Sequence, residues 1–191
     1  KKLNYLITLI MIAATVTGCA TAVVGGAATG AAVVHDRRTA GTVVDDQGIE
    51  LKINNAIGGN QRLSENSHIN VTSYNLNVLL SGEVASNALK AKAARMVNTV
   101  PKSRQVLNYL VVGPKTPLGS RTKDTWITTK VKSNLFKVEI PNFDPTRIKV
   151  VTEAQTVFLL GLVKRGEGKA AIDVARKVSD VKKVVALFEY L

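Results

Sequence analysis

Residues 78–84 read VLLSGEV and residues 157–163 read VFLLGLV, so one apolar segment with an interior glycine occurs twice. Apolar residues fill alternate positions of both segments, which predicts strands with a buried face. Gly82 and Gly161 indicate either a bulge or the close approach of another backbone. Because the two segments lie 79 residues apart, we interpret them as parts of an internal repeat.

The repeat continues on both sides of these segments. Before each segment, apolar residues spaced four apart predict the buried stripe of a short helix. An aspartate, Asp46 or Asp124, stands near the start of each stripe, and we expect it to cap the helix. After each segment come a second helical pattern and a further strand. The first-helix stripes are Ile49, Ile53 and Ile57 in one copy and Ile127, Val131 and Leu135 in the other.

The order of elements predicts an α+β protein of two tandem domains. Each is expected to be αββαβ, with two helices packed on one face of a small mixed three-stranded sheet. We place the domains at residues 44–113 and 122–191. The segment 114–121, which contains two prolines and one glycine, is expected to be a linker. Domains of about 70 residues have marginal cores, which favours packing of one domain on the other.

Residues 1–18 have the pattern of a secretory signal peptide. Two lysines precede an apolar run over 3–16, which as a helix reaches roughly 21 Å and is too short for a bilayer core of about 30 Å. The run leads into Val16-Thr17-Gly18-Cys19, which resembles a bacterial lipobox. This resemblance implies that Cys19 is acylated and begins the mature protein, with Ala20 after it implying the outer membrane. The alternative is an ordinary apolar cysteine. Residues 19–43 are expected to be a lipid-anchored flexible tether.

Few residues in this chain suggest catalysis or metal binding. It has one Cys and two His, which excludes a disulfide framework and a Cys/His zinc site. His35 falls in the tether and His68 just before a strand, with no carboxylates clustered around either along the chain. No nucleophile stands in a recognisable catalytic motif. We therefore predict no catalytic residues, no metal and no cofactor, and a protein that is not an enzyme.

The charge is strongly positive. The chain has 26 Lys and Arg against 14 Asp and Glu, a net charge of +12, and the second domain has thirteen basic and eight acidic side chains against seven and five in the first. A positive surface indicates an acidic partner, which could be nucleic acid, anionic lipid or an acidic protein. Nucleic acid is disfavoured because a signal peptide removes the chain from it and aromatic residues are few.

The repeat resembles the BON domain of bacterial envelope proteins. The matching features are the short first helix, the hairpin with a hydrophobic-x-Gly-x-Val segment, and the Ala-rich second helix. Two copies behind a lipobox resemble the dual-BON outer-membrane lipoprotein family of DolP over essentially the whole chain. The glycine usual in the hairpin turn of this family is absent from both copies, which have Asn75-Leu76-Asn77 and Ala154-Gln155.

The resemblance implies a protein on the periplasmic face of the outer membrane that binds anionic phospholipids such as phosphatidylglycerol or cardiolipin. It implies a role in envelope integrity without catalysis, contact with outer-membrane assembly or cell-division proteins, and enrichment at the division site.

The first helix of the second domain is the candidate phospholipid site. Its outward stripe contains Trp126, and Gly48 stands at the matching position of the first domain, so the fold does not require a Trp there. An exposed indole flanked by ammonium groups suits a lipid interface. The alternative is that Trp126 packs between the domains or against a strand edge. The predicted site consists of Lys123, Trp126, Thr129, Lys130, Ser133, Asn134 and Lys137.

A second basic surface lies further along the second domain, at Lys164, Arg165, Lys169, Arg176, Lys177, Lys182 and Lys183. Its alternative interpretation is a solvated helix face with its turns. The sequence thus favours a lipoprotein whose second domain binds anionic phospholipid. The competing hypothesis is a periplasmic protein-protein adaptor that touches the membrane only through its acyl anchor.

Overall fold

The computed structural model describes residues 36–191 of the chain. The predicted signal peptide, Cys19 and most of the predicted tether lie outside the described residues. Among the residues that are described, none of the helices combines the length and the apolar character that crossing a membrane requires.

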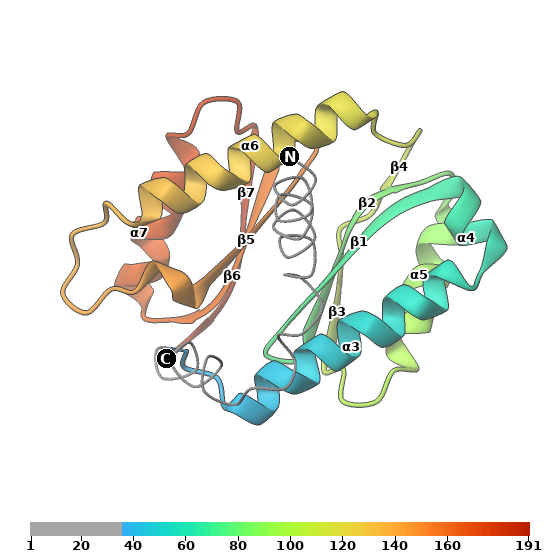
Figure 1. Ribbon diagram of the computed structural model, residues 1–191, viewed down its shortest axis with the longest axis horizontal. Coiled ribbons are helices and arrows are strands. Elements are labelled where there is room, and N and C mark those ends of the chain that lie inside the picture. Colours follow the sequence, from blue (N-terminus) through green and yellow to red (C-terminus); the bar gives the residue numbers. More distant parts are fainter. Residues whose placement is uncertain (1–35) are drawn as a thin grey trace, which may run out of the picture. The chain divides into compact units, whose positions relative to one another are not determined.

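The first domain contains α3 (Ala40–Gly58), α4 (Gln61–Asn66), β1 (Ser67–Tyr74), β2 (Asn77–Val84), α5 (Asn87–Asn98), β3 (Gln105–Asn108) and β4 (Val111–Val112). Strand β2 pairs antiparallel with β1 and parallel with both β3 and β4, so the sheet is mixed. Helices α3 and α5 lie on the same side of this sheet (Figure 1). The predicted order and layering are confirmed, with the short α4 as an addition, and the last predicted strand is divided into β3 and β4, so this sheet has four strands and not three.

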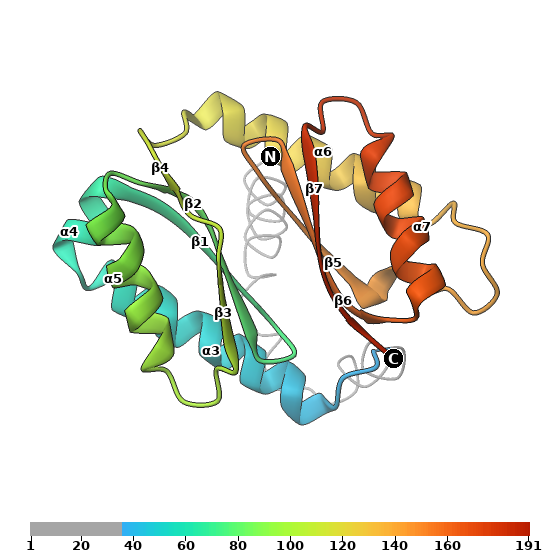
Figure 2. The same ribbon diagram turned by 180° about the vertical axis from the view of Figure 1, so that it is seen from behind.

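The second domain contains α6 (Leu118–Leu135), a 3₁₀ turn (Pro145–Arg147), β5 (Ile148–Glu153), β6 (Thr156–Val163), α7 (Arg165–Arg176) and β7 (Lys183–Tyr190). Strand β6 is central, antiparallel to β5 and parallel to β7. Helices α6 and α7 cover the same face of this sheet (Figure 2). The two sheets share no strand, so each repeat has a sheet of its own.

Each domain has a separate apolar core between its helices and its sheet. The predicted stripe of α3 packs there with Val78, Leu80 and Val84 of β2. In the second domain Val157, Leu159 and Val163 of β6 pack in the same way against the stripe of α6. Alternation along these strands therefore predicts correctly which side chains face the helices.

The other faces of the two sheets form a third apolar cluster. Tyr74 and Leu79 of the first domain are buried together with Phe158 and Leu160 of the second. All eight residues of β2 are buried, because helices cover one face of the strand and the second domain covers the other. The expected contact between domains is thus an extensive packing of one sheet on the other.

Polar contacts surround this third cluster. Glu189 of β7 accepts hydrogen bonds from Asn75 and Asn77, at 2.8 and 2.9 Å, and pairs with Arg104. On α3, Glu50 pairs with Lys149 of β5 at 2.9 Å. These bonds fix how one sheet lies on the other, because each requires a defined distance and direction.

The predicted helix caps are wrong. Helix α3 begins at Ala40, within the predicted tether, and its N-cap is Thr39, whose hydroxyl accepts from the Thr42 N–H. Helix α6 begins at Leu118, within the predicted linker, with Pro117 at the N-cap. Asp46 and Asp124 therefore lie inside the helices and not at their ends. The helices extend back to Thr39 and Pro117 because no proline interrupts the residues before each aspartate, and the one glycine in each stretch, Gly41 or Gly119, is accommodated in the first turn.

The two aspartates instead hold the hairpin turns. Both side chains are buried. Asp46 accepts from the backbone N–H groups of Asn75 and Leu76, each at 2.8 Å. Asp124 accepts from those of Ala154 and Gln155, at 2.9 and 2.8 Å. A carboxylate pairs well with two adjacent N–H donors, so each helix is fastened to the turn of its own sheet.

These bonds account for turns without glycine. The central residues Asn75 and Leu76 have φ of 51° and 66°, and Ala154 and Gln155 have 48° and 62°. Positive φ at both central positions of a two-residue loop is the type I′ hairpin turn. A side chain in this left-handed region costs about 1–2 kcal/mol per residue. Charge-assisted bonds to a buried carboxylate, about 1.5–3 kcal/mol each, are large enough to offset that cost.

The two glycines of the repeated segment are explained by close backbone approach. Gly82 has a φ of 109°, and a Cβ there would lie 2.0 Å from the carbonyl oxygen of His68. A Cβ on Gly161 would lie 2.9 Å from the carbonyl oxygen of Arg147. Both strands nevertheless keep an unbroken register with their antiparallel partners, so neither glycine marks a bulge.

Candidate functional site

Trp126 stands on the outer side of α6. It is 57% exposed, whereas its neighbour Ile127 is completely buried. The Lys130 ammonium lies 5.0 Å from the centre of the indole ring, within cation–π range. The alternative in which Trp126 packs between the domains is therefore wrong, and its outward position is the one that a lipid-facing residue needs.

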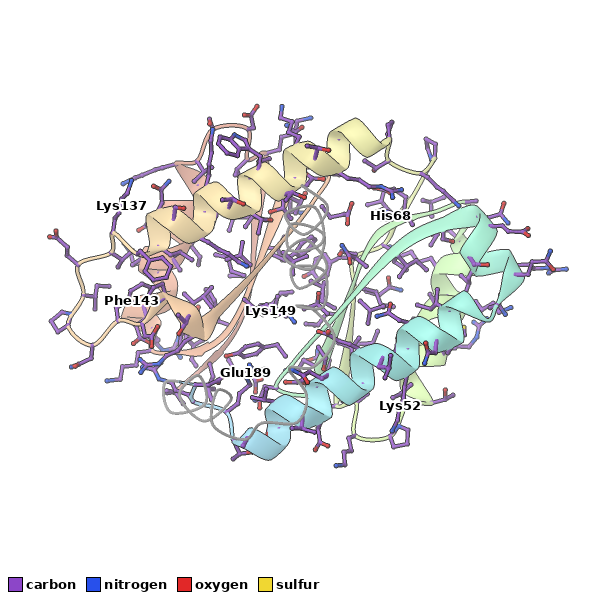
Figure 3. The ribbon with its side chains drawn as sticks, viewed as in Figure 1. Lys52, His68, Lys137, Phe143, Lys149 and Glu189 are labelled. Atoms are coloured by element: carbon purple, nitrogen blue, oxygen red, sulfur yellow. The ribbon has the colours of Figure 1, made fainter. Side chains whose placement is uncertain are left out.

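The predicted residues lie together along one side of this helix, which we call the α6 face. Thr129, Ser133 and Lys137 are exposed beside Trp126, while Lys130 and Asn134 are partly covered. Figure 3 shows Lys137 at the end of the helix. The only acidic residue of α6 is Asp124, which is buried, so the helix presents basic and neutral groups to solvent. The α6 face consists of Lys123, Trp126, Thr129, Lys130, Ser133, Asn134 and Lys137.

The loop after α7 borders the α6 face. Lys130 Nζ is 3.1 Å from the Ser179 hydroxyl, and Lys123 Nζ is 2.8 Å from an Asp180 carboxylate oxygen. The hydrogen bond from Lys123 lowers the pKa of Asp180. Such an exposed pair contributes little stability. Its effect at this surface is to neutralise part of the charge of Lys123, which leaves Lys130 as the cation beside the indole.

Sequence reasoning missed Phe136, the residue just after α6. It is 69% exposed. At 1.5 Å and 100° per residue it lies about 15 Å along the helix and about 80° around it from Trp126, and it lines a cavity together with Lys132 of α6 and Tyr74 of the first domain. The sequence does contain a signal for this exposure. Leu135 belongs to the buried stripe, and the next residue, Phe136, points about 100° further around the helix.

The second basic surface is more dispersed. Its seven residues are all exposed, but they are divided between α7, the loop after it and the start of β7. Lys169 pairs with Asp173, and Arg165 lies over the ring of Tyr190. Lys182 is the member nearest to the α6 face, since it lines a cavity of about 490 Å³ together with Lys123. The structure therefore connects this end of the second basic surface with α6.

On its other side α6 borders a cavity of about 500 Å³ that also reaches β1 and β5. Arg121 and Lys132 line the cavity together with Thr125 and Thr128. Across it lie His68 of the first domain and Glu153 of the second. Burial raises the pKa of Glu153. No cluster of carboxylates surrounds His68 along the chain, whereas the fold places Glu83 and Glu153 beside it.

The comparisons with known proteins agree with this architecture. The BON domain family matches the chain twice, at residues 45–114 and 123–191. The fold and these matches define the class, which is a protein of two tandem BON domains.

The chain belongs to the dual BON-domain family of DolP. It is 40% identical over 184 residues to the outer membrane lipoprotein DolP of Haemophilus influenzae. The matched region covers 95% of this chain and 94% of that protein. It is 33% identical over 156 residues to the 21 kDa hemolysin of Actinobacillus pleuropneumoniae, with 82% and 79% covered. Neither the domain's name nor the name DolP denotes a catalytic activity. Among solved structures, the C-terminal domain of CdsD, from the type III secretion system of Chlamydia trachomatis, is similar with a TM-score of 0.30 and 11% identity over 76% of this chain and 67% of that one.

Proposed function

We propose that this protein is a lipoprotein of the periplasmic face of the outer membrane, whose second BON domain binds anionic phospholipid through the α6 face. The observation that carries the proposal is an exposed Trp126 in cation–π contact with Lys130, on a helix whose only carboxylate is buried. The proposed lipid anchor is Cys19. The family relationship to an outer membrane lipoprotein supports the location.

Two kinds of energy support binding at this surface. Each Lys near an anionic membrane contributes roughly 1 kcal/mol, and this contribution falls off within a Debye length of about 8–10 Å. The lysines alone would therefore give loose binding that salt abolishes. The indole of Trp126 adds apolar area that salt does not screen, and it prefers the headgroup region. Phe136 supplies a second exposed ring at the end of the helix.

The test is binding of residues 36–191 to vesicles, with no acyl anchor. We expect binding to vesicles that contain phosphatidylglycerol or cardiolipin and little binding to phosphatidylcholine alone. Trp126→Ala should remove most of the binding while leaving the circular dichroism spectrum and the melting temperature unchanged. Lys130→Glu should weaken binding and reduce its dependence on salt, because it removes one cation and adds an anion. An unchanged affinity in Trp126→Ala would contradict the proposed site.

The competing function is a protein adaptor that meets the membrane only through its anchor. The dispersed basic surface around α7 is the observation that favours it, because Arg176, Lys177 and Lys183 are exposed and do not belong to α6. This function predicts that residues 36–191 do not bind vesicles at all, and that charge reversal at these three positions, but not Trp126→Ala, impairs envelope function.

In the cell, we propose that phospholipid binding supports envelope integrity by positioning the protein, through outer-membrane assembly or division machinery. Enrichment of the protein at the division site follows from this proposal. A fluorescent fusion should be enriched there, and Trp126→Ala should distribute it evenly and make the cells more sensitive to detergents.

A further inference from the structure

His68 lies between two buried carboxylates that come from different domains. Its Nδ1 is 3.3 Å from Glu83 Oε2 and 3.6 Å from Glu153 Oε1. The His68 side chain is 21% exposed, and those of Glu83 and Glu153 are 9% and 6% exposed. His68 and Glu83 face each other across the β1–β2 pair, while Glu153 ends β5. Figure 3 shows His68 in the region between the first domain and α6.

These distances are long for direct hydrogen bonds. An N–H···O bond is typically 2.9–3.0 Å, and 3.6 Å is beyond the usual limit. One Nδ1–H also cannot point at two oxygens at once. A tetrahedral ion with ligands at about 2.1 Å holds neighbouring ligand atoms about 3.4 Å apart. The distances from Nδ1 to the two carboxylate oxygens fit that spacing, and all three ligand atoms lie within 4.8 Å of one another.

The groups that donate hydrogen bonds to the two carboxylates from Thr116 and Asn70 orient them without neutralising them. Thr116 donates to Glu83 through its backbone N–H, at 3.1 Å, and through its hydroxyl. Asn70 donates its side-chain amide to Glu153 at 3.4 Å. These donors are uncharged. Buried carboxylates are stable in proteins when they are paired with a cation or coordinate a metal, and groups that hydrogen-bond to metal ligands fix their direction.

We propose that His68, Glu83 and Glu153 bind one divalent transition-metal ion, with zinc as the best match, and that this ion joins the two BON domains. Imidazole nitrogen and carboxylate oxygen are both zinc ligands, and an open zinc site takes three protein ligands and leaves a fourth position for water. The cavity of about 500 Å³ beside His68 and Glu153 gives room for that water. Magnesium and calcium are disfavoured because they prefer six or more oxygen ligands.

The proposal is independent of lipid binding by the α6 face and can be tested separately. The full chain, without an affinity tag, is purified in detergent, treated with a chelator and titrated with zinc chloride by calorimetry. We expect one zinc ion per chain, a higher melting temperature with zinc, and no comparable effect of magnesium. Loss of a group that only orients a ligand usually costs 10–100-fold in metal affinity, so removal of a ligand in His68→Ala should cost at least about 100-fold.

The chain provides matched controls. His35→Ala removes the only other histidine and should leave zinc affinity unchanged, as should Trp126→Ala. Glu153→Gln keeps the shape of the side chain, so it tests the ligand even if His68→Ala fails to fold. Cobalt(II) bound to the wild-type chain should show the intense visible absorption of a tetrahedral site. The proposal is overturned if wild-type protein binds no zinc, or if folded Glu153→Gln binds it as tightly as wild type; the cluster is then an ion pair of protonated His68.

Discussion

Helices α3 and α6 occupy equivalent positions in the two domains but present different outer surfaces. Each buries an apolar stripe of three residues and one aspartate that holds a hairpin turn. On the outside, α3 has Gly48 and the acidic Asp45, which pairs with Lys102. At the matching places α6 has Trp126 and the basic Lys123, whereas Lys130 has its counterpart in Lys52 of α3. The comparison teaches that the fold dictates the inner positions of these helices, while the outer positions are available for binding.

The comparison extends to the segment before α3, where two consecutive arginines serve different domains. Arg38 donates to Asp46 at 2.8 Å and lies over the ring of Tyr74, in the first domain. Arg37 reaches the second domain, where it contacts both carboxylate oxygens of Glu167 and the Leu162 carbonyl. The residues directly before α3 are thus attached to both domains.

The largest expected effect concerns the two aspartates. Asp46→Ala should lower the free energy of unfolding by about 4 kcal/mol. The reason is that buried donors lose their acceptor and an arginine loses a charged partner. Asp124→Ala should lower it by about 2–3 kcal/mol, because fewer groups bond to this carboxylate. Besides the two turn N–H groups, Asp46 binds the Ser73 hydroxyl and Arg38. Urea denaturation checks both values, and an equal loss in the two variants would contradict the difference between the domains.

Exchanging the outer residues at positions 48 and 126 between the two helices should show that only the second domain binds lipid strongly. A Cβ at Gly48 meets nothing within 4 Å, so a larger side chain fits there. Trp126→Gly should weaken vesicle binding at least tenfold. Adding Gly48→Trp to that variant should restore less than a tenth of the lost affinity, because α3 has Asp45 at the position where α6 has the basic Lys123. Full rescue by Gly48→Trp would show that the indole suffices without the basic helix.

The pH dependence of stability should reveal the pair of Arg37 and Glu167. The hydrogen bonds from Arg37 hold the pKa of Glu167 below its usual value of 4.5. A carboxyl group with a lowered pKa stabilises the fold above its unfolded pKa and loses that contribution as the pH falls through the folded value. Arg37→Ala should therefore destabilise the protein at pH 7, and the difference from wild type should shrink below about pH 4.5. Melting temperatures measured between pH 3 and 7 check this, and a difference that stays constant with pH would refute it.

The smallest expected effect is a gain in stability. Gly48→Ala should raise the free energy of unfolding by about 0.5–1 kcal/mol, because alanine loses less backbone entropy than glycine in a helix interior. Gly48 lies inside α3 with open space around it. Thermal unfolding measures the gain, and vesicle binding should stay unchanged. A loss of stability would mean that the position is constrained in a way that its surroundings do not show.

The local parts of the fold could be predicted from the sequence. The helix stripes and the inward residues of β2 and β6 follow from periods of 3.6 and 2, which depend only on neighbouring residues. The outward direction of Trp126 follows from the same helical period, since Ile127, Val131 and Leu135 already occupy the inner side. Its assignment to phospholipid stays a prediction, as does that of Cys19, which lies outside the described residues.

The sequence by itself determined two repeats, their elements and the sides on which their apolar residues lie. Only the tertiary structure decided the contacts between distant segments. Asp46 and Asp124 looked like caps because their partners are turn N–H groups about 30 residues later. His68 looked solitary because Glu153 is 85 residues further along the chain and belongs to the other domain. The physical reason is that a period describes one element at a time, whereas the packing of two sheets depends on the whole folded surface of each.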